Sequence, residues 1–436
     1  MRKRTRVAVT LLIIVAFLAT GAFFYNMSLK KREEAARGNW YDNLIFKNTS
    51  FIYEFVRAIG YSYYKGADIG ECIETARRIK DGDIYSWYTE WLKTAGRLHK
   101  LARKFERSGN VLSAREAYFR ASNYYRSAGF YLHSKANLPK SLKSWKRSRE
   151  CFLKAISSLS SVEVVKIPYE NTTLPGYFVK TKNTEEKPPL LIVHTGFDGT
   201  GEELYFAVAQ AATERGYNCL IFEGPGQGEV IRIQKIPFRP NWEKVVTPVV
   251  DYALTRPEVD KDKIALMGLS MGGYLAPRAV TVEHRIKACI ANGGVFDFSE
   301  NIYNGFPEEL KNLLNTDPEK FNSEIKEAMK EDTEIAWFFN NGIWTFGVNT
   351  PAELMKAIKK YTLRSIVKEI KCHMLVINSE ADMFFKGQPE KLYKELDCPK
   401  DYITFTKKEA AEAHCQVGAV AISNEVVFNW LDKVMK

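Results

Sequence analysis

The sequence has few of the residues that build metal and nucleotide sites. Only six of its 436 residues are histidines, and it contains no H-E-x-x-H motif, no paired C-x-x-C motif and no Walker A loop. We therefore expect no metal and no other cofactor. Glycine (27) and proline (16) are too scarce for a collagen-like chain, and a 45% hydrophobic content excludes a disordered one.

Cysteine shows no disulfide pattern. The seven cysteines are an odd number without paired spacing, and Cys219 and Cys289 lie in apolar runs typical of buried, reduced thiols. This favours a reducing compartment, although the amino terminus indicates the opposite.

Acidic residues are absent from the first 32 residues, which hold seven of the basic ones. The net charge of +11 is therefore largely terminal, and the remaining +4 or so is too little for a nucleic-acid-binding protein. Residues 7–25 are uncharged and apolar, and as a helix they would span about 28 Å, close to the thickness of a bilayer core. We interpret 1–6 as a basic tail, 7–25 as a transmembrane helix and 26–38 as a linker. A cleaved signal peptide is the alternative.

The basic tail favours retention of the amino terminus in the cytoplasm, although basic residues after the apolar run nearly balance it. We predict a single-pass membrane protein whose body, including its catalytic domain, lies outside the cytoplasm.

The length of the chain is sufficient for two or three domains. Residues 39–160 have apolar residues three and four apart, which predicts a helical domain. From 161 to 436, a strand pair is followed by continuous apolar runs that alternate with helical stretches, which predicts a mostly parallel sheet with helices on both faces, an α/β fold. The run ending at Gly294 and the run starting at His373 are too far apart for one α/β unit, so we expect a lid insertion at about 297–368.

The strongest chemical signal is a glycine-flanked serine. Strand-like Ile264–Met267 leads into Gly268-Leu269-Ser270-Met271-Gly272, and a helical stretch follows. G-x-S-x-G in this context is typical of a nucleophile elbow, a tight turn that exposes the serine hydroxyl. We predict that Ser270 is a nucleophile and that the Met271 amide stabilises a developing oxyanion.

A serine nucleophile needs a base. In the chain order Ser, Asp or Glu, His, only His414 follows every acid at a predicted strand end. The strand His373–Asn378 is followed by Glu380 and Asp382. We prefer Asp382, because the acid usually lies a few residues beyond this strand, and Glu380 is the alternative. His194, at the end of an earlier strand, is also expected near the site.

Two glycine-rich loops are expected beside the serine. The loop HTGFDGTG follows the first parallel strand, and we predict that its Phe197 amide is the second oxyanion donor. The segment Gly224–Gly228 lacks the G-x-G-x-x-G spacing of a dinucleotide site, so we interpret it as a turn lining the pocket.

These residues carry a family resemblance. GLSMGG, NSEAD and AEAHCQ, in this order, resemble the α/β-hydrolase superfamily. SAREAYFRASNYYR, TGFDGTGEE, FEGPGQG and NNGIWTFGV are similar to one branch of it, which includes dihydroxypseudooxynicotine hydrolase and polyketide-shortening hydrolases. The resemblance covers about residues 40–436. It implies a helical cap over the active site, a Ser270–His414–Asp382 triad and cleavage of a carbon–carbon bond beside an activated ketone, assisted by an extra carboxylate for which Asp297 and Glu300 are candidates.

The resulting expectation is a membrane-anchored serine hydrolase that cleaves a small-molecule ester, amide or ketone. We expect an apolar pocket walled by aromatic residues of the insertion and of the helical domain, namely Trp337, Phe338, Trp344, Phe346, Tyr124 and Tyr125. The alternative is a catalytically silent hydrolase scaffold that acts as a membrane-tethered interaction module. No nucleic-acid partner is expected, and a homodimer is left open.

Overall fold

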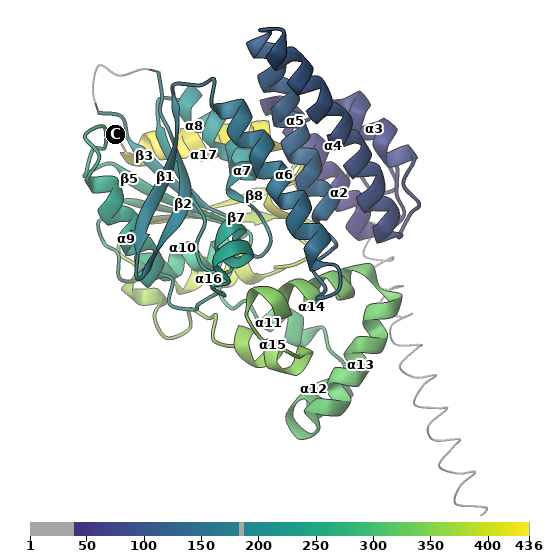
Figure 1. Ribbon diagram of the computed structural model, residues 1–436. Helices are drawn as coiled ribbons and strands as arrows, with labels where there is room; N and C mark the ends of the chain where they lie inside the picture. Colours follow the sequence, from purple (N-terminus) through teal and green to yellow (C-terminus); the bar gives the residue numbers. More distant parts are fainter. Residues whose placement is uncertain (1–38, 183–186, 436) are drawn as a thin grey trace, which may run out of the picture.

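The computed structural model describes residues 39–182 and 187–435. Its centre is one eight-stranded sheet in the order β1-β2-β4-β3-β5-β6-β7-β8 (Figure 1). The antiparallel pair β1 and β2 lies at one edge, β2 is antiparallel to β4, and the other neighbours are parallel. The carboxyl ends of strands β3 to β8 therefore meet at one edge of the sheet. The strands are β1 (Val162–Tyr169), β2 (Thr172–Val179), β3 (Leu190–His194), β4 (Asn218–Phe222), β5 (Ile264–Leu269), β6 (Ala288–Asn292), β7 (His373–Ser379) and β8 (Lys400–Phe405).

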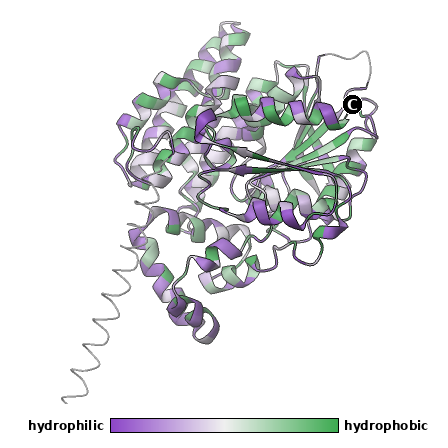
Figure 2. Ribbon diagram, turned by 180° about the vertical axis from the view of Figure 1, so that it is seen from behind, coloured by the Kyte–Doolittle hydropathy of each residue, from purple (hydrophilic) through white to green (hydrophobic). Residues whose placement is uncertain are grey.

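The strands of the sheet interior are apolar because both of their faces are covered. Successive side chains of a strand point to opposite faces. Leu191 and Val193 of β3 join a core that continues into the helices of the amino-terminal half, whereas Leu190 and Ile192 join a core on the other face. Figure 2 shows these strands as a largely apolar band inside more polar helices. The two cores are built with the helices α7 (Gly201–Leu204), α8 (Gln210–Glu214), α9 (Glu243–Leu254), α10 (Gly272–Val280), α16 (Gln388–Glu395) and α17 (Val420–Met435), and with η3 (Tyr205–Ala209) and η4 (Val230–Gln234).

Before the sheet, the chain is helical, and we call this part the helical region. Asp83 caps the longest helix by accepting hydrogen bonds from the Tyr85 and Ser86 amides, and this helix buries Trp87 and Trp91. Phe119, Phe152 and Phe206 pack together where the region meets the sheet layer. The elements are α2 (Thr49–Gly60), η2 (Tyr61–Tyr64), α3 (Ile69–Arg77), α4 (Ile84–Arg107), α5 (Val111–Gly129) and α6 (Leu138–Ile156).

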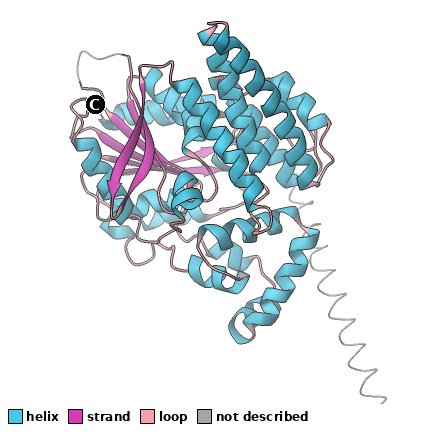
Figure 3. Ribbon diagram, viewed as in Figure 1, coloured by secondary structure: helices cyan, strands magenta, loops and turns pink. Residues whose placement is uncertain are grey.

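A second helical group, which we call the insertion, separates β6 from β7. Its helices form one group beside the sheet, at the lower side of the view in Figure 3 and next to the ends of the helical region. Its elements are α11 (Glu300–Asn304), α12 (Glu308–Thr316), α13 (Pro318–Glu331), α14 (Thr333–Thr345), α15 (Pro351–Ile358) and η5 (Val367–Glu369). Two short turns, η6 (Lys407–Glu409) and η7 (His414–Gln416), follow β8.

The predicted localisation requires correction. Within residues 39–182 and 187–435, no helix has both the length and the apolar content needed to cross a bilayer. None of these residues therefore supports the predicted single-pass membrane localisation with the catalytic domain outside the cytoplasm. The apolar run 7–25, with the tail and linker that flank it, lies outside the described residues.

Candidate active site

Ser270 occupies a tight turn between β5 and α10. Its φ of +62° lies in the left-handed region, which non-glycine residues rarely adopt. The turn requires a glycine two residues before Ser270, because a Cβ on Gly268 would lie 2.0 Å from the carbonyl oxygen of Gly272. The Ser270 amide donates to the Asn292 carbonyl at 2.9 Å, which ties the turn to β6. The serine hydroxyl is thus presented at the edge where the parallel strands end.

His414 and Asp382 come to the same edge from the loops after β8 and β7. His414 Nε2 lies 2.9 Å from Ser270 Oγ, and His414 Nδ1 lies 2.7 Å from Asp382 Oδ2. The other carboxylate oxygen of Asp382 accepts hydrogen bonds from the Phe384 and Phe385 amides at 2.8 and 2.9 Å. The alternative acid, Glu380, instead accepts from the Lys407 amide at the surface.

Burial and charge oppose each other in this pair. Burial alone would lower the pKa of His414, but Asp382 and Cys415 together outweigh this effect and raise that pKa well above its usual value. Burial would likewise raise the pKa of Asp382, but His414 and the two amides hold it below its usual value. The arrangement therefore stabilises an imidazolium–carboxylate pair, the state that forms when His414 accepts a proton.

His194 lies outside this arrangement. It is fully buried, its Nδ1 is 2.9 Å from the Thr195 carbonyl, and its ring packs against Phe222 and Trp242. Burial lowers its pKa to about 4, so it is a neutral core histidine.

Two backbone amides beside Ser270 are without a hydrogen-bond acceptor in the part of the chain that the structure describes. They are the amides of Met271 and Phe197. The loops that carry them are in close contact, since a Cβ on Gly196 would lie 2.6 Å from the Met271 nitrogen. The loop after β3 and the turn at Ser270 therefore bring these two amides close to each other.

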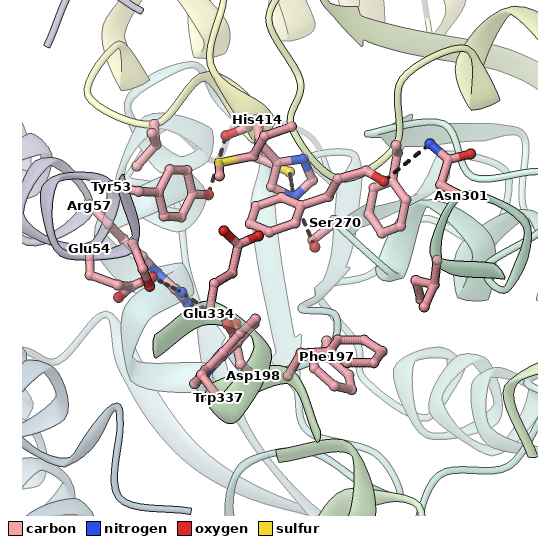
Figure 4. Close-up of a pocket in the computed structure, with 18 of the residues that line it drawn as sticks. Tyr53, Glu54, Arg57, Phe197, Asp198, Ser270, Asn301, Glu334, Trp337 and His414 are labelled. Carbon is pink, nitrogen blue, oxygen red and sulfur yellow. Dashed lines mark hydrogen bonds and ion pairs between the residues drawn. The ribbon is translucent and has the colours of Figure 1, made fainter. Parts of the chain in front are cut away.

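A cavity of about 820 Å³ opens at Ser270 and His414. Its walls come from the sheet edge, the insertion and the helical region, and Figure 4 shows Arg57 and Glu54 on one side of Ser270 and Asn301 on the other. Most of the lining is aromatic or aliphatic, with a charged wall formed by Glu54, Arg57, Asp198 and Glu203. This volume suits a ligand of drug-like size or larger.

Two of the predicted aromatic residues line the cavity. Trp337 stacks on Phe130 of the helical region at 5.3 Å and contacts Phe197, and Phe338 stacks on Phe197 at 5.6 Å. Phe346 lies behind this layer, against Phe238 and Phe298, and does not line the cavity.

The prediction that Tyr124, Tyr125 and Trp344 line the pocket is wrong, because none of them lines the cavity. Tyr124 is buried inside the helical region, where its hydroxyl donates to Glu71 at 3.0 Å, and Tyr125 packs there against His99. Trp344 does not line the cavity and packs against His133. The spacing of these aromatics reflects helix packing rather than ligand binding.

The proposed extra carboxylates also lie elsewhere. Asp297 pairs with Arg364 at 3.1 Å, and Glu300 pairs with Lys391 and Arg364. Neither lines the cavity. The Gly224–Gly228 turn does not line it either, and instead its Gln227 side chain contacts the loop after β3.

Sequence reasoning missed the charged wall and Cys415. Arg57 of α2 contacts Asp198 and Glu203, more than 140 positions later in the chain. No local pattern indicates such a pairing, because a basic residue on a helix usually faces solvent. Cys415 lines the cavity with its Sγ 3.4 Å from His414 Nε2; only its place next to the predicted base could have pointed to it.

Comparison with known proteins shows extended similarity. The chain is 35% identical over 422 residues to the alpha/beta hydrolase psoB of Aspergillus fumigatus, covering 89% of this chain and 94% of the relative. It is 34% identical over 407 residues to the 20-hydroxy-prefusarin hydrolase FUS2 of Gibberella moniliformis, covering 89% and 97%. Residues 204–336 match the model of the prolyl oligopeptidase family.

The fold is also similar to a solved structure. The crystal structure of the 2,6-dihydroxy-pseudo-oxynicotine hydrolase superposes with a TM-score of 0.68, at 21% sequence identity, over 86% of this chain and 95% of that one. The helical region and the sheet are thus shared as an architecture.

Proposed function

Because the chain belongs to the α/β-hydrolase superfamily and is a hydrolase, we propose that it is a serine hydrolase whose nucleophile is Ser270. The observation that carries the proposal is the continuous hydrogen-bond path from Ser270 Oγ through the His414 ring to Asp382, with contacts of 2.9 and 2.7 Å. Such a path lets an imidazole remove the hydroxyl proton while a buried carboxylate stabilises the charge that results.

The mechanism follows from this path. Ser270 Oγ attacks the carbonyl carbon of the substrate, and His414 takes its proton. The amides of Met271 and Phe197 hold the oxygen on which negative charge develops. His414 then gives the proton to the leaving group, and a water molecule that it activates releases the acyl group from Ser270.

The substrate is a small molecule with a carbonyl-centred bond: an ester, an amide or the carbon–carbon bond of an activated ketone. The cavity supports a largely apolar substrate, because residues such as Phe298, Ile302 and Trp337 form most of its lining. We also propose that residues 39–160 act as a cap domain and about 297–368 as a lid on the catalytic domain 161–436, since residues of all three line the cavity.

The test is turnover by wild type and by Ser270→Ala on a panel of acyl esters, aminoacyl amides and β-diketones. We expect wild type to hydrolyse at least one class and Ser270→Ala to lose at least about 10⁴-fold of kcat. Substrate turnover that survives the substitution would contradict the proposal. The class with the largest kcat/KM identifies the bond that is cleaved.

A further inference from the structure

The loop after β3, residues 195–198, is held by side chains from three separate parts of the chain. Gln227 comes from the turn after β4, Asn341 from the insertion and Arg57 from the helical region. This loop carries the Phe197 amide, so any role of these side chains in the reaction rests on the proposed function.

Gln227 fixes the peptide plane that bears this amide. Its side chain is 2% exposed, and its Oε1 accepts a hydrogen bond from the Gly224 amide at 3.0 Å, which turns Nε2 toward the loop. Nε2 donates to the Thr195 carbonyl at 2.6 Å and to the Gly196 carbonyl at 3.4 Å. The Gly196 C=O and the Phe197 N–H belong to one planar trans peptide and point in opposite directions. Holding the carbonyl therefore sets the direction of the N–H.

Asn341 holds the other side of Phe197. This asparagine of α14 is 1% exposed, and its Nδ2 donates to the Phe197 carbonyl at 3.0 Å. The rings of Trp337 and Phe338, from the same helix, pack on the Phe197 ring. The insertion thus restrains both the backbone and the side chain of Phe197.

Arg57 holds the next residue, Asp198. Its Nη1 and Nη2 lie 3.3 and 3.2 Å from the Asp198 carboxylate, its Nε and Nη2 donate to Glu203 at 2.6 and 2.7 Å, and its Nη1 donates to Glu54 at 3.1 Å. These contacts account for all five N–H groups of a guanidinium.

Because its donors are occupied by protein carboxylates, Arg57 restrains the loop rather than a ligand. The pairing is strongly charged: burial would raise the pKa of Glu203, but Arg126 and Arg57 lower it to about 2.

We propose that Arg57, Gln227 and Asn341 are positioning residues that pre-align the Phe197 amide with the oxyanion formed at Ser270. Donors that need no reorganisation during the reaction stabilise the transition state most. The helical region and the insertion therefore contribute to the rate of the chemical step as well as to the walls of the cavity.

The test compares Asn341→Leu and Gln227→Met with Asn123→Leu in the full chain. Asn123 is a matched control: it is 4% exposed, and its Nδ2 donates to the carbonyls of Ala58 and Gly66 within the helical region. Asn341→Leu loses one buried hydrogen bond to a backbone carbonyl and Asn123→Leu loses two, but only Asn341 contacts the loop. Arg57→Lys tests the helical region separately.

The probes are p-nitrophenyl butyrate and an alkyl trifluoromethyl ketone. When the ketone binds, Ser270 Oγ forms a bond to its carbonyl carbon, the carbonyl electron pair moves onto the oxygen, and His414 takes the serine proton. The Ki of the ketone therefore reports on the oxyanion, whereas KM reports mainly on substrate binding.

We expect Asn341→Leu, Gln227→Met and Arg57→Lys to lower kcat about 10- to 100-fold with KM changed less than about twofold. The Ki of the ketone should rise by the factor by which kcat/KM falls. Asn123→Leu should retain kcat and Ki even where its Tm falls.

The inference would be overturned if the Ki of the ketone were unchanged in Asn341→Leu, Gln227→Met and Arg57→Lys. It would also be overturned if Asn123→Leu lost as much kcat as Asn341→Leu. A wild type that neither hydrolyses the ester nor binds the ketone would overturn the proposed function, and the inference with it. An active wild type matched by the Asn341 and Gln227 variants would overturn the inference alone.

Discussion

Among single residues, Asp382 governs His414 in two ways. Its Oδ2 fixes the ring by accepting from Nδ1, so that Nε2 faces Ser270 Oγ. Its charge also raises the pKa of His414 against the effect of burial. Position and charge are separable, because an asparagine keeps the shape of the side chain and removes the charge.

Asp382→Asn should lower kcat by about 10⁴-fold, the loss known for this substitution in other serine hydrolases, because the ring is no longer held in the correct tautomer. His414 must be neutral to act as a base, so kcat/KM rises as pH increases through its pKa. Without the carboxylate that pKa is lower, and the acidic limb of the kcat/KM profile should move to lower pH. Residual activity of the variant, measured from about pH 4 to 9, checks this. A limb that stays in place would show that Asp382 does not set the pKa.

The sequence was sufficient to select three side chains that the structure brings together, Ser270, His414 and Asp382, because each follows a strand end and their chain order is restrictive. It was not sufficient for Arg57 or Gln227, whose contacts with the loop after β3 depend on packing between distant elements. Tyr124 and Tyr125 were predicted to line the pocket but are buried inside the helical region. A recurring aromatic pattern on a helix indicates a buried face, but it does not indicate what covers that face.

Among the elements, the strand–turn–helix unit β5–α10 has the strictest requirements. Strands β3 to β7 were predictable because short, continuous apolar runs that alternate with helical stretches leave few other structures. The turn itself was predictable because the G-x-S-x-G spacing leaves space for helix and strand to approach, and a Cβ on Gly268 would close that space, 2.0 Å from the Gly272 carbonyl oxygen. The packing of the insertion was not predictable, because its helices are amphipathic and many arrangements would bury their apolar faces.

Gly268→Ala should destabilise the protein by about 2 kcal/mol or more and abolish turnover, because a Cβ at this position forces the turn apart. Gly96→Ala is the matched control: it lies inside α4, and its Cβ would meet nothing closer than 3.8 Å. This control should gain about 0.5–1 kcal/mol through lower backbone entropy of the unfolded chain. Urea unfolding and kcat/KM check both. Equal effects of the two substitutions would contradict the assigned role of the turn.

For the whole molecule, the interface between the helical region and the sheet layer determines whether the two parts unfold together. One apolar core includes Phe119 and Phe152 of the helical region, Phe206 of η3 and strand residues such as Leu191. Arg57 and Arg126 pair across the same boundary with Glu203. A continuous core of this kind predicts cooperative unfolding.

We therefore expect one calorimetric transition with equal calorimetric and van't Hoff enthalpies. Phe206→Ala, at a position 1% exposed, should lower the stability by about 3–5 kcal/mol and move that single transition to lower temperature. Tyr63→Ala, at a position 63% exposed, should change it by no more than about 0.5 kcal/mol. Two separate transitions in the wild type would show that the helical region and the sheet layer are independent units.

Whether Ser270 is the nucleophile is tested most directly by the site that a fluorophosphonate labels covalently. Trypsin releases residues 264–278 as one peptide, in which Ser270 is the sole serine and Cys415 is absent. We predict an adduct at Ser270 in this peptide, which is lost in Ser270→Ala and forms far more slowly in His414→Ala. An adduct at another residue, such as Cys415, or labelling that persists in Ser270→Ala, would contradict this prediction.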